Sequence, residues 1–220
     1  MERKIITTSD GSKTIHLPDW NESYHSKHGA LQEALHVFIY SGLQTIQLER
    51  LNILEVGFGS GLNAILTLMT AEERNITVNY TGLEAFPLSE EEFNALNYKD
   101  LEIISSYSKQ LQAMFEAAWE EEVSIQPNFF LKKQEVLLEE YLPVENSFNL
   151  VYFDAFGPRV QPNLWSFEVL SKLYKALDKN GVFVTYCAKG QVRRDLISLG
   201  FEVEKIPGPP GKREMLRAKK

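Results

Sequence analysis

Residues 54–63 place the strongest constraint on how this chain can fold. An apolar run at 52–56 leads directly into a loop with glycines at three alternate positions: Gly57, Gly59 and Gly61. A helical apolar pattern follows, from residue 62 to about 71. Because glycine has no Cβ, the loop can turn tightly and let a ligand lie against the main chain at a helix N-terminus. The segment therefore predicts a strand, a ligand-binding turn and a helix.

The glycine spacing indicates which ligand this turn suits. A dinucleotide fingerprint reads G-x-G-x-x-G, but Leu62 stands where its third glycine should be, which argues against a nicotinamide oxidoreductase. The observed spacing is E-x-G-x-G-x-G, with Glu55 two residues before the first glycine. It favours S-adenosylmethionine, which has no pyrophosphate and carries an ammonium that a carboxylate can hold. An ordinary strand–turn–helix junction remains the alternative at this point.

Two further acids follow predicted strands. Residues 77–83 form a second β-rich run that ends at Glu84, where one carboxylate can accept from both hydroxyls of a ribose. Residues 148–153 are apolar on both faces, as in a buried parallel strand, and lead into Asp154. Ligands of open α/β sheets bind at the carboxyl ends of such strands. Glu84 and Asp154 therefore strengthen the prediction of a nucleoside cofactor.

The alternation of strand and helix patterns predicts one α/β domain over 1–220, with a doubly wound, mostly parallel sheet. We expect a Rossmann-like core at 30–220 that ends in an antiparallel hairpin of strands 201–206 and 214–218. Residues 1–29 are expected to form an extension that has a β-hairpin around Asp10 and Gly11 and covers the cofactor and the substrate. A short strand is expected at 129–131, and another at 182–187 after Gly181. Helices are expected at 30–45, 89–97, 105–119, after Glu135, 166–177 and 191–199.

Composition excludes several classes of protein. No apolar stretch approaches a membrane span, and the first four residues are not followed by the apolar core of a signal peptide. The single cysteine, Cys187, excludes an internal disulfide. His25, His28 and His36 lie close in sequence, but no Cys, Asp or Glu completes a ligand spacing, so no metal is expected. We expect a soluble cytoplasmic protein without membrane contact.

The charge distribution is uneven. The net charge of −7 argues against indiscriminate nucleic-acid binding, yet basic residues concentrate in the last 30 positions. Solvated surface is the commoner explanation of such a cluster. A local basic face for RNA therefore stays open.

Together these segments resemble the methyltransferase domain of MnmC-type enzymes, which make 5-methylaminomethyl-uridine at the wobble position of tRNA. The matching stretches, which span nearly the whole chain in the same order, are 24–38, 57–63, 84–88, 154–158, 163–165, 192–194, 200–201 and 212–216. The resemblance implies a class I S-adenosylmethionine methyltransferase fold and the tRNA anticodon loop as partner. Bifunctional members carry a following FAD-dependent oxidase domain. Because this chain stops at Lys220, we expect a methyltransferase without FAD, and the sequence requires no protein partner.

The resemblance and the residue pattern together assign the site. The expected cofactor-binding residues are Tyr24, Glu55, Gly57, Gly59, Gly61, Asn63, Glu84, Gln134 and Asp154. The expected substrate-binding residues are Phe156 and Pro158, which could stack on a splayed base, and Arg159, Lys189, Arg193, Lys212 and Arg213, which could contact phosphates. One departure concerns the Gly-Asp pair of the family, which is Lys133-Gln134 here. The Gln134 carbonyl can still accept from the adenine amino group.

The expected reaction is displacement at the sulfonium methyl by a primary amine of 5-aminomethyl-(2-thio)uridine. Asp154 is the expected catalytic residue, which aligns the amine and accepts its proton directly or through water. Its alternative role is to bind the methionine amino group or to cap Gly157-Pro158.

Two other functions stay open. One is a methyltransferase for a small-molecule amine, which the acidic net charge favours and the Lys212–Leu216 motif opposes. The other is a non-catalytic RNA-binding subunit, which the intact glycine loop and Glu84 oppose.

Overall fold

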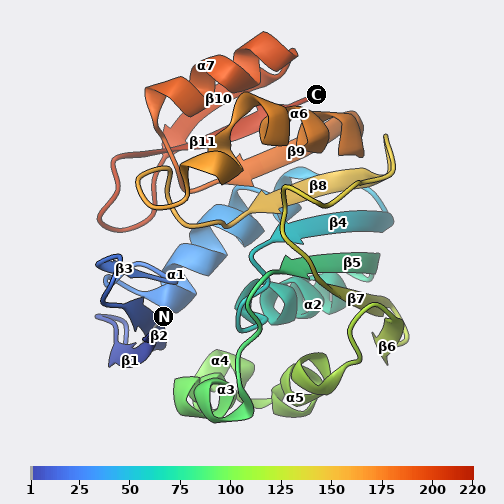
Figure 1. Cartoon of the computed structure of the whole chain (residues 1–220). Coiled ribbons are helices and arrows are strands. Elements are labelled where there is room, and N and C mark those ends of the chain that lie inside the picture. The colour runs from blue at the N-terminus through green and yellow to red at the C-terminus, as the bar shows by residue number, and fades with distance from the viewer. Residues whose placement is uncertain (1) are drawn as a thin grey trace.

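The computed structural model describes residues 2–220. Its main sheet has eight strands in the order β10-β11-β9-β8-β4-β5-β7-β6 (Figure 1). Their bounds are β4 Arg50–Val56, β5 Thr77–Glu84, β6 Glu122–Gln126, β7 Phe129–Glu135, β8 Phe148–Phe153, β9 Leu177–Thr185, β10 Glu202–Pro207 and β11 Glu214–Lys219. Strands β7, β5, β4, β8 and β9 are parallel neighbours. The doubly wound, mostly parallel sheet is therefore confirmed.

Both edges of this sheet are antiparallel. Strand β11 runs antiparallel to β9 and to β10, which confirms the C-terminal hairpin. At the other edge β6 pairs antiparallel with β7. The sequence analysis did not foresee β6, because its residues are mostly polar and only partly buried.

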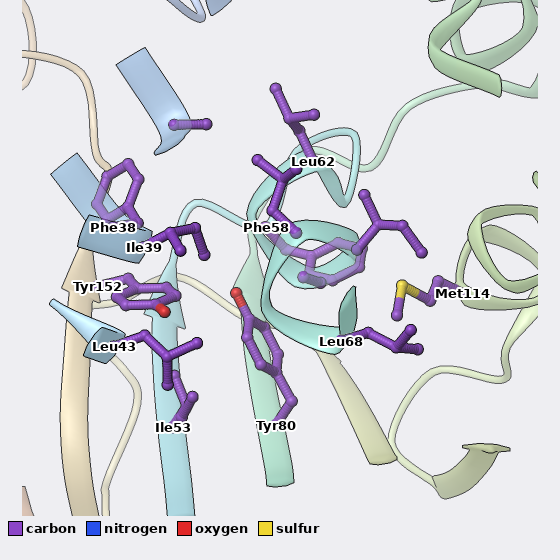
Figure 2. Close-up of a cluster of buried hydrophobic side chains, with 14 of the residues drawn as sticks. Phe38, Ile39, Leu43, Ile53, Phe58, Leu62, Leu68, Tyr80, Met114 and Tyr152 are labelled. Atoms are coloured by element: carbon purple, nitrogen blue, oxygen red, sulfur yellow. The ribbon is translucent and has the colours of Figure 1, made fainter. Parts of the chain in front are cut away.

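Helices cover both faces of the sheet. They are α1 Ala30–Ala34, α2 Leu62–Arg74, α3 Glu90–Leu96, α4 Glu102–Ser105, α5 Ser108–Glu116, α6 Phe167–Ala176 and α7 Gly190–Leu199. On one face Ile53 belongs to a core cluster with Phe38, Leu68 and Tyr152 (Figure 2). On the other, Leu54 packs in a second cluster with residues of α6 and α7. This in-and-out alternation along β4 buries the strand on both sides, as its continuous apolar run predicts.

Several predicted elements differ in the structure. The helix expected at 105–119 is shorter at both ends, because α4 ends at Ser105 before a turn and Trp119 forms a parallel bridge to Lys133. The helix expected after Glu135 is absent among the described residues; the chain turns there and leaves Leu137 and Leu142 exposed. The prediction failed because the apolar residues of this exposed loop have the spacing of an amphipathic helix.

Two further differences concern the type of a helix and the bounds of a strand. The helix expected at 30–45 is α-helical only to Ala34, and it continues as a π-helical turn, Leu35–Tyr40, and a 3₁₀ turn, Leu43–Thr45. Strand β9 begins before Gly181 and ends at Thr185, so Cys187 is buried beyond the strand. A Cβ at Gly181 would lie 2.8 Å from the Asp178 carbonyl oxygen, which explains why a glycine stands inside the strand.

The N-terminal extension forms its own small sheet. Strands β1 (Lys4–Thr7) and β2 (Lys13–Leu17) pair antiparallel around Asp10 and Gly11, which confirms the hairpin, and β3 (Glu22–Ser23) adds a third strand. The Asp10 carboxylate accepts from the main-chain N–H of Gln32 in α1 and thereby ties the extension to the core. No helix among residues 2–220 is long and apolar enough to cross a membrane.

Candidate active site

The strand order reverses between β4 and β8, and a cavity lies at this point. Strand β4 has β5 on one side and β8 on the other. From β4 the chain continues toward β5, whereas from β8 it continues toward β9 on the opposite side of the sheet. The Asp154 N–H donates to the Val56 carbonyl oxygen (3.0 Å) where the two strands end. A cavity of about 660 Å³ opens there, a volume in the range of small-molecule sites. It occupies the crevice in which open α/β sheets bind ligands.

The glycine loop forms one wall of this cavity. Gly57 has φ +87°, and a Cβ on it would lie 2.7 Å from the Asp154 carbonyl oxygen. Gly57 and Phe58 both donate their N–H groups to the Leu83 carbonyl oxygen (3.0 and 2.9 Å). Behind the loop, the Phe58 ring occupies the space that a Cβ on Gly82 would need. The loop is therefore held by main-chain contacts that no other residue type at Gly57 would allow.

Glu84 lies at the end of β5, beside the glycine loop, and lines the cavity. Its Oε2 accepts from the Gly59 N–H and its Oε1 from the Phe86 N–H, each at 2.9 Å. Both carboxylate oxygens keep further lone pairs for ligand hydroxyls.

Asn63 lines the cavity and carries a buried acceptor. Its amide nitrogen donates to Glu55 Oε1 (2.8 Å) and Asp154 Oδ2 (3.0 Å), whereas its Oδ1 is buried and has no hydrogen-bond partner among the described residues. In this arrangement the amide nitrogen of Asn63 serves both carboxyl groups. A buried acceptor without a partner costs free energy, and a ligand that donates to it would remove that cost. An ammonium or N–H donor is the kind of ligand group that could satisfy Asn63 Oδ1.

Glu55 does not reach the cavity. It is fully buried, and it accepts from Asn63 and from the Tyr80 hydroxyl (2.8 Å). Burial raises its pKa to about 8 against the opposing effect of both hydrogen bonds. The predicted direct contact between Glu55 and a ligand ammonium therefore needs correction, because Asn63 stands between the carboxyl group and the cavity.

Asp154 lines the cavity next to Asn63. Burial, followed by the negative charges of Glu33 and Glu55, raises its pKa well above the usual range, while the Asn63 hydrogen bond and the Lys212 charge oppose the shift. A carboxyl group in this setting binds a proton more tightly than an exposed aspartate does. That property suits a group that takes a proton from a substrate.

An aromatic wall from two distant segments faces the same cavity. The Phe156 ring makes edge contacts with Trp20 (5.4 Å between centroids) and Tyr24 (5.3 Å), and all three line the cavity. Burial raises the pKa of Tyr24 to about 12, so its hydroxyl keeps its proton. The sequence analysis missed Trp20, because no periodic pattern marks a lone aromatic residue in a loop.

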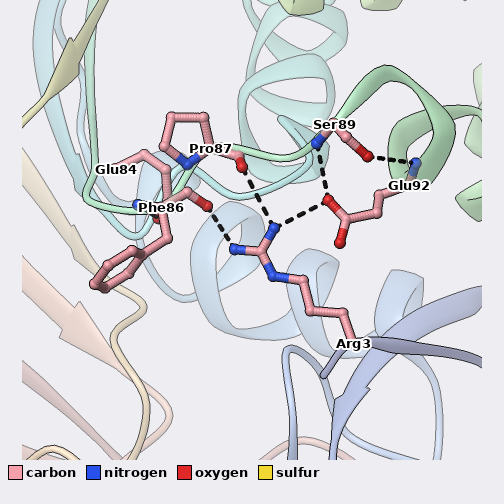
Figure 3. A network of polar contacts seen from close by, with 6 residues as sticks. All are labelled: Arg3, Glu84, Phe86, Pro87, Ser89 and Glu92. Atoms are coloured by element: carbon pink, nitrogen blue, oxygen red, sulfur yellow. Dashed lines mark hydrogen bonds and ion pairs between the residues drawn. The ribbon is translucent and has the colours of Figure 1, made fainter. Parts of the chain in front are cut away.

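Arg3 fastens the N-terminal extension across the segment after β5. Its guanidinium donates to the carbonyl oxygens of Phe86 (2.7 Å) and Pro87 (3.3 Å) and pairs with Glu92 (3.0 Å) (Figure 3). Arg3 also lines the cavity. The extension therefore forms a wall of the cavity, at the place where the sequence predicted that residues 1–29 cover the ligands.

Several predicted site residues lie elsewhere. Gln134 and Pro158 do not line the cavity, and the Gln134 amide donates to Glu120 (3.1 Å). The segment after β7 contributes 136–139 instead, and the segment after Pro158 contributes 160–164. The prediction failed there because β7 runs on to Glu135, which carries the ligand-facing turn further along the chain.

The predicted phosphate contacts fall into two groups. Lys212 pairs with buried Glu33 (2.6 Å), and Arg159 pairs with Glu22 (2.8 Å) and donates to the Trp20 carbonyl oxygen. Both are engaged within the protein, contrary to the expectation of free phosphate contacts. Lys189 and Arg213 are exposed, and Arg193 is half-buried.

The three histidines that lie close in sequence, His25, His28 and His36, do not share one site. His25 shares a hydrogen bond with Thr14 (3.1 Å), and burial lowers its pKa to about 4, whereas His36 contacts the Pro207 carbonyl oxygen. No group of three or more His, Cys, Asp or Glu in the described chain could hold a metal ion.

Known proteins share this sequence pattern and fold. A family model described as S-adenosyl-L-methionine-dependent methyltransferase matches residues 102–220. The tRNA 5-methylaminomethyl-2-thiouridine biosynthesis bifunctional protein MnmC of Cupriavidus metallidurans is 30% identical over 97% of this chain and 33% of its own length. The protein of the same name from Delftia acidovorans is 28% identical over 99% of the chain and 35% of its own length. The chain thus spans about a third of the length of these relatives.

A solved structure shows the same fold. The crystal structure of MNMC2 from Aquifex aeolicus superposes with a TM-score of 0.77 at 26% identity, covering 99% of this chain and 69% of its own.

Proposed function

The chain belongs to the family of S-adenosyl-L-methionine-dependent methyltransferases, and from this premise we propose that it N-methylates 5-aminomethyl-(2-thio)uridine at the tRNA wobble position. The product is 5-methylaminomethyl-(2-thio)uridine. Support comes from the relatives that are named for biosynthesis of that nucleoside and that match nearly all of the chain. We further propose that 1–220 act as one domain, since the extension supplies cavity residues.

The observation that carries the proposal is the pair of acceptors on the cavity wall. The free Oδ1 of Asn63 and the carboxylate of Asp154 lie beside each other, joined through the Asn63 amide nitrogen. Methyl transfer to an amine brings two nitrogen groups to the site: the ammonium of the cofactor and the amine of the substrate. Two adjacent acceptors fit that requirement.

The residues that would hold the cofactor follow from the same geometry. When bound, S-adenosylmethionine supplies a methyl group activated on a sulfonium. Glu84 would accept from the ribose hydroxyls, and Asn63 Oδ1 from the ammonium. The glycine loop lets the main chain approach the ligand, and Tyr24 covers it from the extension. Glu55 acts through Asn63, whose amide it orients.

Asp154 would handle the proton of the substrate amine. An amine attacks only as the neutral base, so its proton must leave before or during the reaction. The Asp154 carboxylate can hydrogen-bond the amine, fix its direction and accept that proton. The Phe156 and Trp20 rings offer an apolar surface for a splayed base and limit the access of water. Lys189 and Arg213 are exposed and would contact RNA phosphates.

A small-molecule amine is the second candidate substrate. The net charge of −7 favours it, because RNA binding gains from positive charge. A non-catalytic RNA-binding role is less well supported, since the glycine loop, Glu84 and Asn63 all face one intact cavity.

A substrate comparison tests the proposal. The protein would be given labelled S-adenosylmethionine with an anticodon stem-loop that carries 5-aminomethyluridine at the wobble position. The matched control is the same stem-loop with unmodified uridine, and a parallel set contains small primary amines. We expect label only in the aminomethyl stem-loop. Label in small amines but in neither RNA would assign the second function.

A further inference from the structure

The turn between β10 and β11 is fastened onto the helical segment that begins with α1. Lys212 Nζ lies 2.6 Å from Glu33 Oε1, and His36 Nε2 lies 2.9 Å from the Pro207 carbonyl oxygen. Gly211 packs against the His28 ring so closely that a Cβ would fall 2.1 Å from it. Three contacts thus hold this end of the hairpin against α1 and the residues on either side of it.

Glu33 is an unusual anchor because it is almost completely buried. Its side chain is 8% exposed, and its second oxygen accepts from the Ser26 N–H (2.6 Å). Lys212 is its only salt-bridge partner in residues 2–220. The Lys212 side chain is 34% exposed, so solvent screens the pair on that side and the pair adds little to stability. Its place in the molecule therefore points to a role beyond holding the turn.

The pair stands directly behind the cavity wall. Lys212 Nζ lies 3.7 Å from the centroid of the Tyr186 ring, and Tyr186 lines the cavity. The Tyr186 hydroxyl donates to the carbonyl oxygen of Ala155 (2.9 Å), the residue next to Asp154. Neither Glu33 nor Lys212 lines the cavity itself. Tyr186 thus links Lys212, and through it Glu33, to the residue next to Asp154.

We propose that Glu33 and Lys212 form a positioning pair, whose opposed charges behind the wall fix the protonation state of Asp154 during methyl transfer. The inference rests on the role proposed above for Asp154. It also gives Lys212 a task inside the protein, in place of the RNA phosphate contact expected from sequence.

The groups that act on Asp154 come from four elements. Glu55 on β4 and Glu33 on α1 add negative charge, Asn63 on α2 donates a hydrogen bond, and Lys212 on the turn adds positive charge. Burial has the largest effect on the pKa of Asp154 and raises it; Glu33 adds to this and Lys212 opposes it. Neutralising one member of the pair should therefore move the titration of Asp154 in the opposite direction from neutralising the other. Loss of fold would not produce opposite shifts.

The test compares wild type, Glu33→Gln, Lys212→Met and the double variant. The rate of a single turnover on the aminomethyl stem-loop is measured against pH at saturating S-adenosylmethionine. We expect Glu33→Gln to move the acid limb to lower pH and Lys212→Met to higher pH, each by about 0.5–1 unit. The double variant should return close to wild type. Lys205→Met serves as the matched control, because Lys205 pairs with Glu214 (2.9 Å) on the exposed part of the same hairpin; it should shift nothing.

Shifts in the same direction, or no shift in either single variant of an active enzyme, would overturn the inference. If wild type does not methylate the stem-loop, the proposed function fails, and the pair is judged by a second measurement. The carboxyl carbon resonance of Asp154, assigned with Asp154→Asn, is then followed against pH in the same proteins. Opposite displacements of the titration midpoint support the pair, and unchanged midpoints refute it.

Discussion

At the scale of single residues, the site depends on the Asn63 amide, whose nitrogen is hydrogen-bonded and whose oxygen has no partner among the described residues. The nitrogen of Asn63 joins Glu55 to Asp154, and its oxygen is buried. Sequence analysis located Asn63, Glu84 and Asp154, because each follows a strand end or a glycine turn, and the structure places all three on the cavity. It misjudged Glu55, since the glycine spacing does not show that Asn63 covers this carboxyl group.

Replacement of Asp154 separates its two possible roles. Asp154→Asn keeps the shape of the side chain and an acceptor for the Asn63 amide, but it loses the basic carboxylate. We expect turnover to fall by about 10²-fold or more and the Kd for S-adenosylmethionine to change by less than about threefold. Single-turnover kinetics and calorimetry measure the two quantities. An equal loss in both would mean that Asp154 binds the cofactor and does not act on the amine.

At the scale of elements, the strands and helices that build the cavity follow the sequence pattern closely. Strands β4, β5 and β8 were predictable because continuous apolar runs mark buried parallel strands. Strand β6 and the extended residues after α5 were not, because partly buried polar segments carry no clear period. The walls contributed by 136–139 and by Arg3 depend on tertiary contacts that no local pattern encodes.

The glycine loop provides a matched pair of substitutions. Gly57→Ala meets both a positive φ of +87° and the Asp154 main chain at 2.7 Å, whereas Gly59→Ala meets a positive φ of +53° and only an ordinary contact with Tyr24 at 3.6 Å. Each pays about 1–2 kcal/mol of backbone strain, but only Gly57→Ala must also displace β8. Thermal unfolding should therefore show the lower Tm for Gly57→Ala, together with loss of cofactor binding. Equal Tm values would contradict the contact with Asp154.

Lys133 joins β7 to the end of α5 by a buried ammonium. It is 2% exposed, donates to the Phe115 carbonyl oxygen (2.6 Å) and lies 4.6 Å from the centroid of the Trp119 ring. No salt bridge to it occurs in the described chain, and burial lowers its pKa from 10.5 to about 8. Burial of the charged Lys133 lowers the free energy of unfolding by its full amount below pH 8, and this loss disappears as pH rises to 10.5. The stability contributed by this group in the wild type should therefore rise between pH 8 and 10.5.

Lys133→Met should remove that cost. At pH 7 we expect the variant to be more stable by about 1 kcal/mol, which raises the Tm by about 2–4 °C. The difference from wild type should shrink between pH 8 and 10. Calorimetry across this range measures it, and a destabilised variant would show that the bond to Phe115 outweighs the burial cost.

At the scale of the whole molecule, an acidic protein is proposed to bind an acidic polymer. A net charge of −7 requires that RNA contact be local, through exposed cations such as Lys189 and Arg213 near the cavity side of the fold. We expect stem-loop affinity to fall steeply with salt while the affinity for S-adenosylmethionine stays nearly constant. Arg213→Ala should reduce the salt slope by about 1. Fluorescence anisotropy in a salt series measures both, and a flat response would argue against a basic face.

Methyl transfer to whole tRNA is the decisive measurement of the proposed activity. Labelled S-adenosylmethionine is supplied with tRNA that carries 5-aminomethyl-uridine at the wobble position, and fully modified tRNA is the control. We expect label in the precursor tRNA alone, recovered after digestion as the methylaminomethyl nucleoside. Measurable cofactor binding without label in either tRNA would rule out tRNA methylation and leave small amines as the candidate substrates.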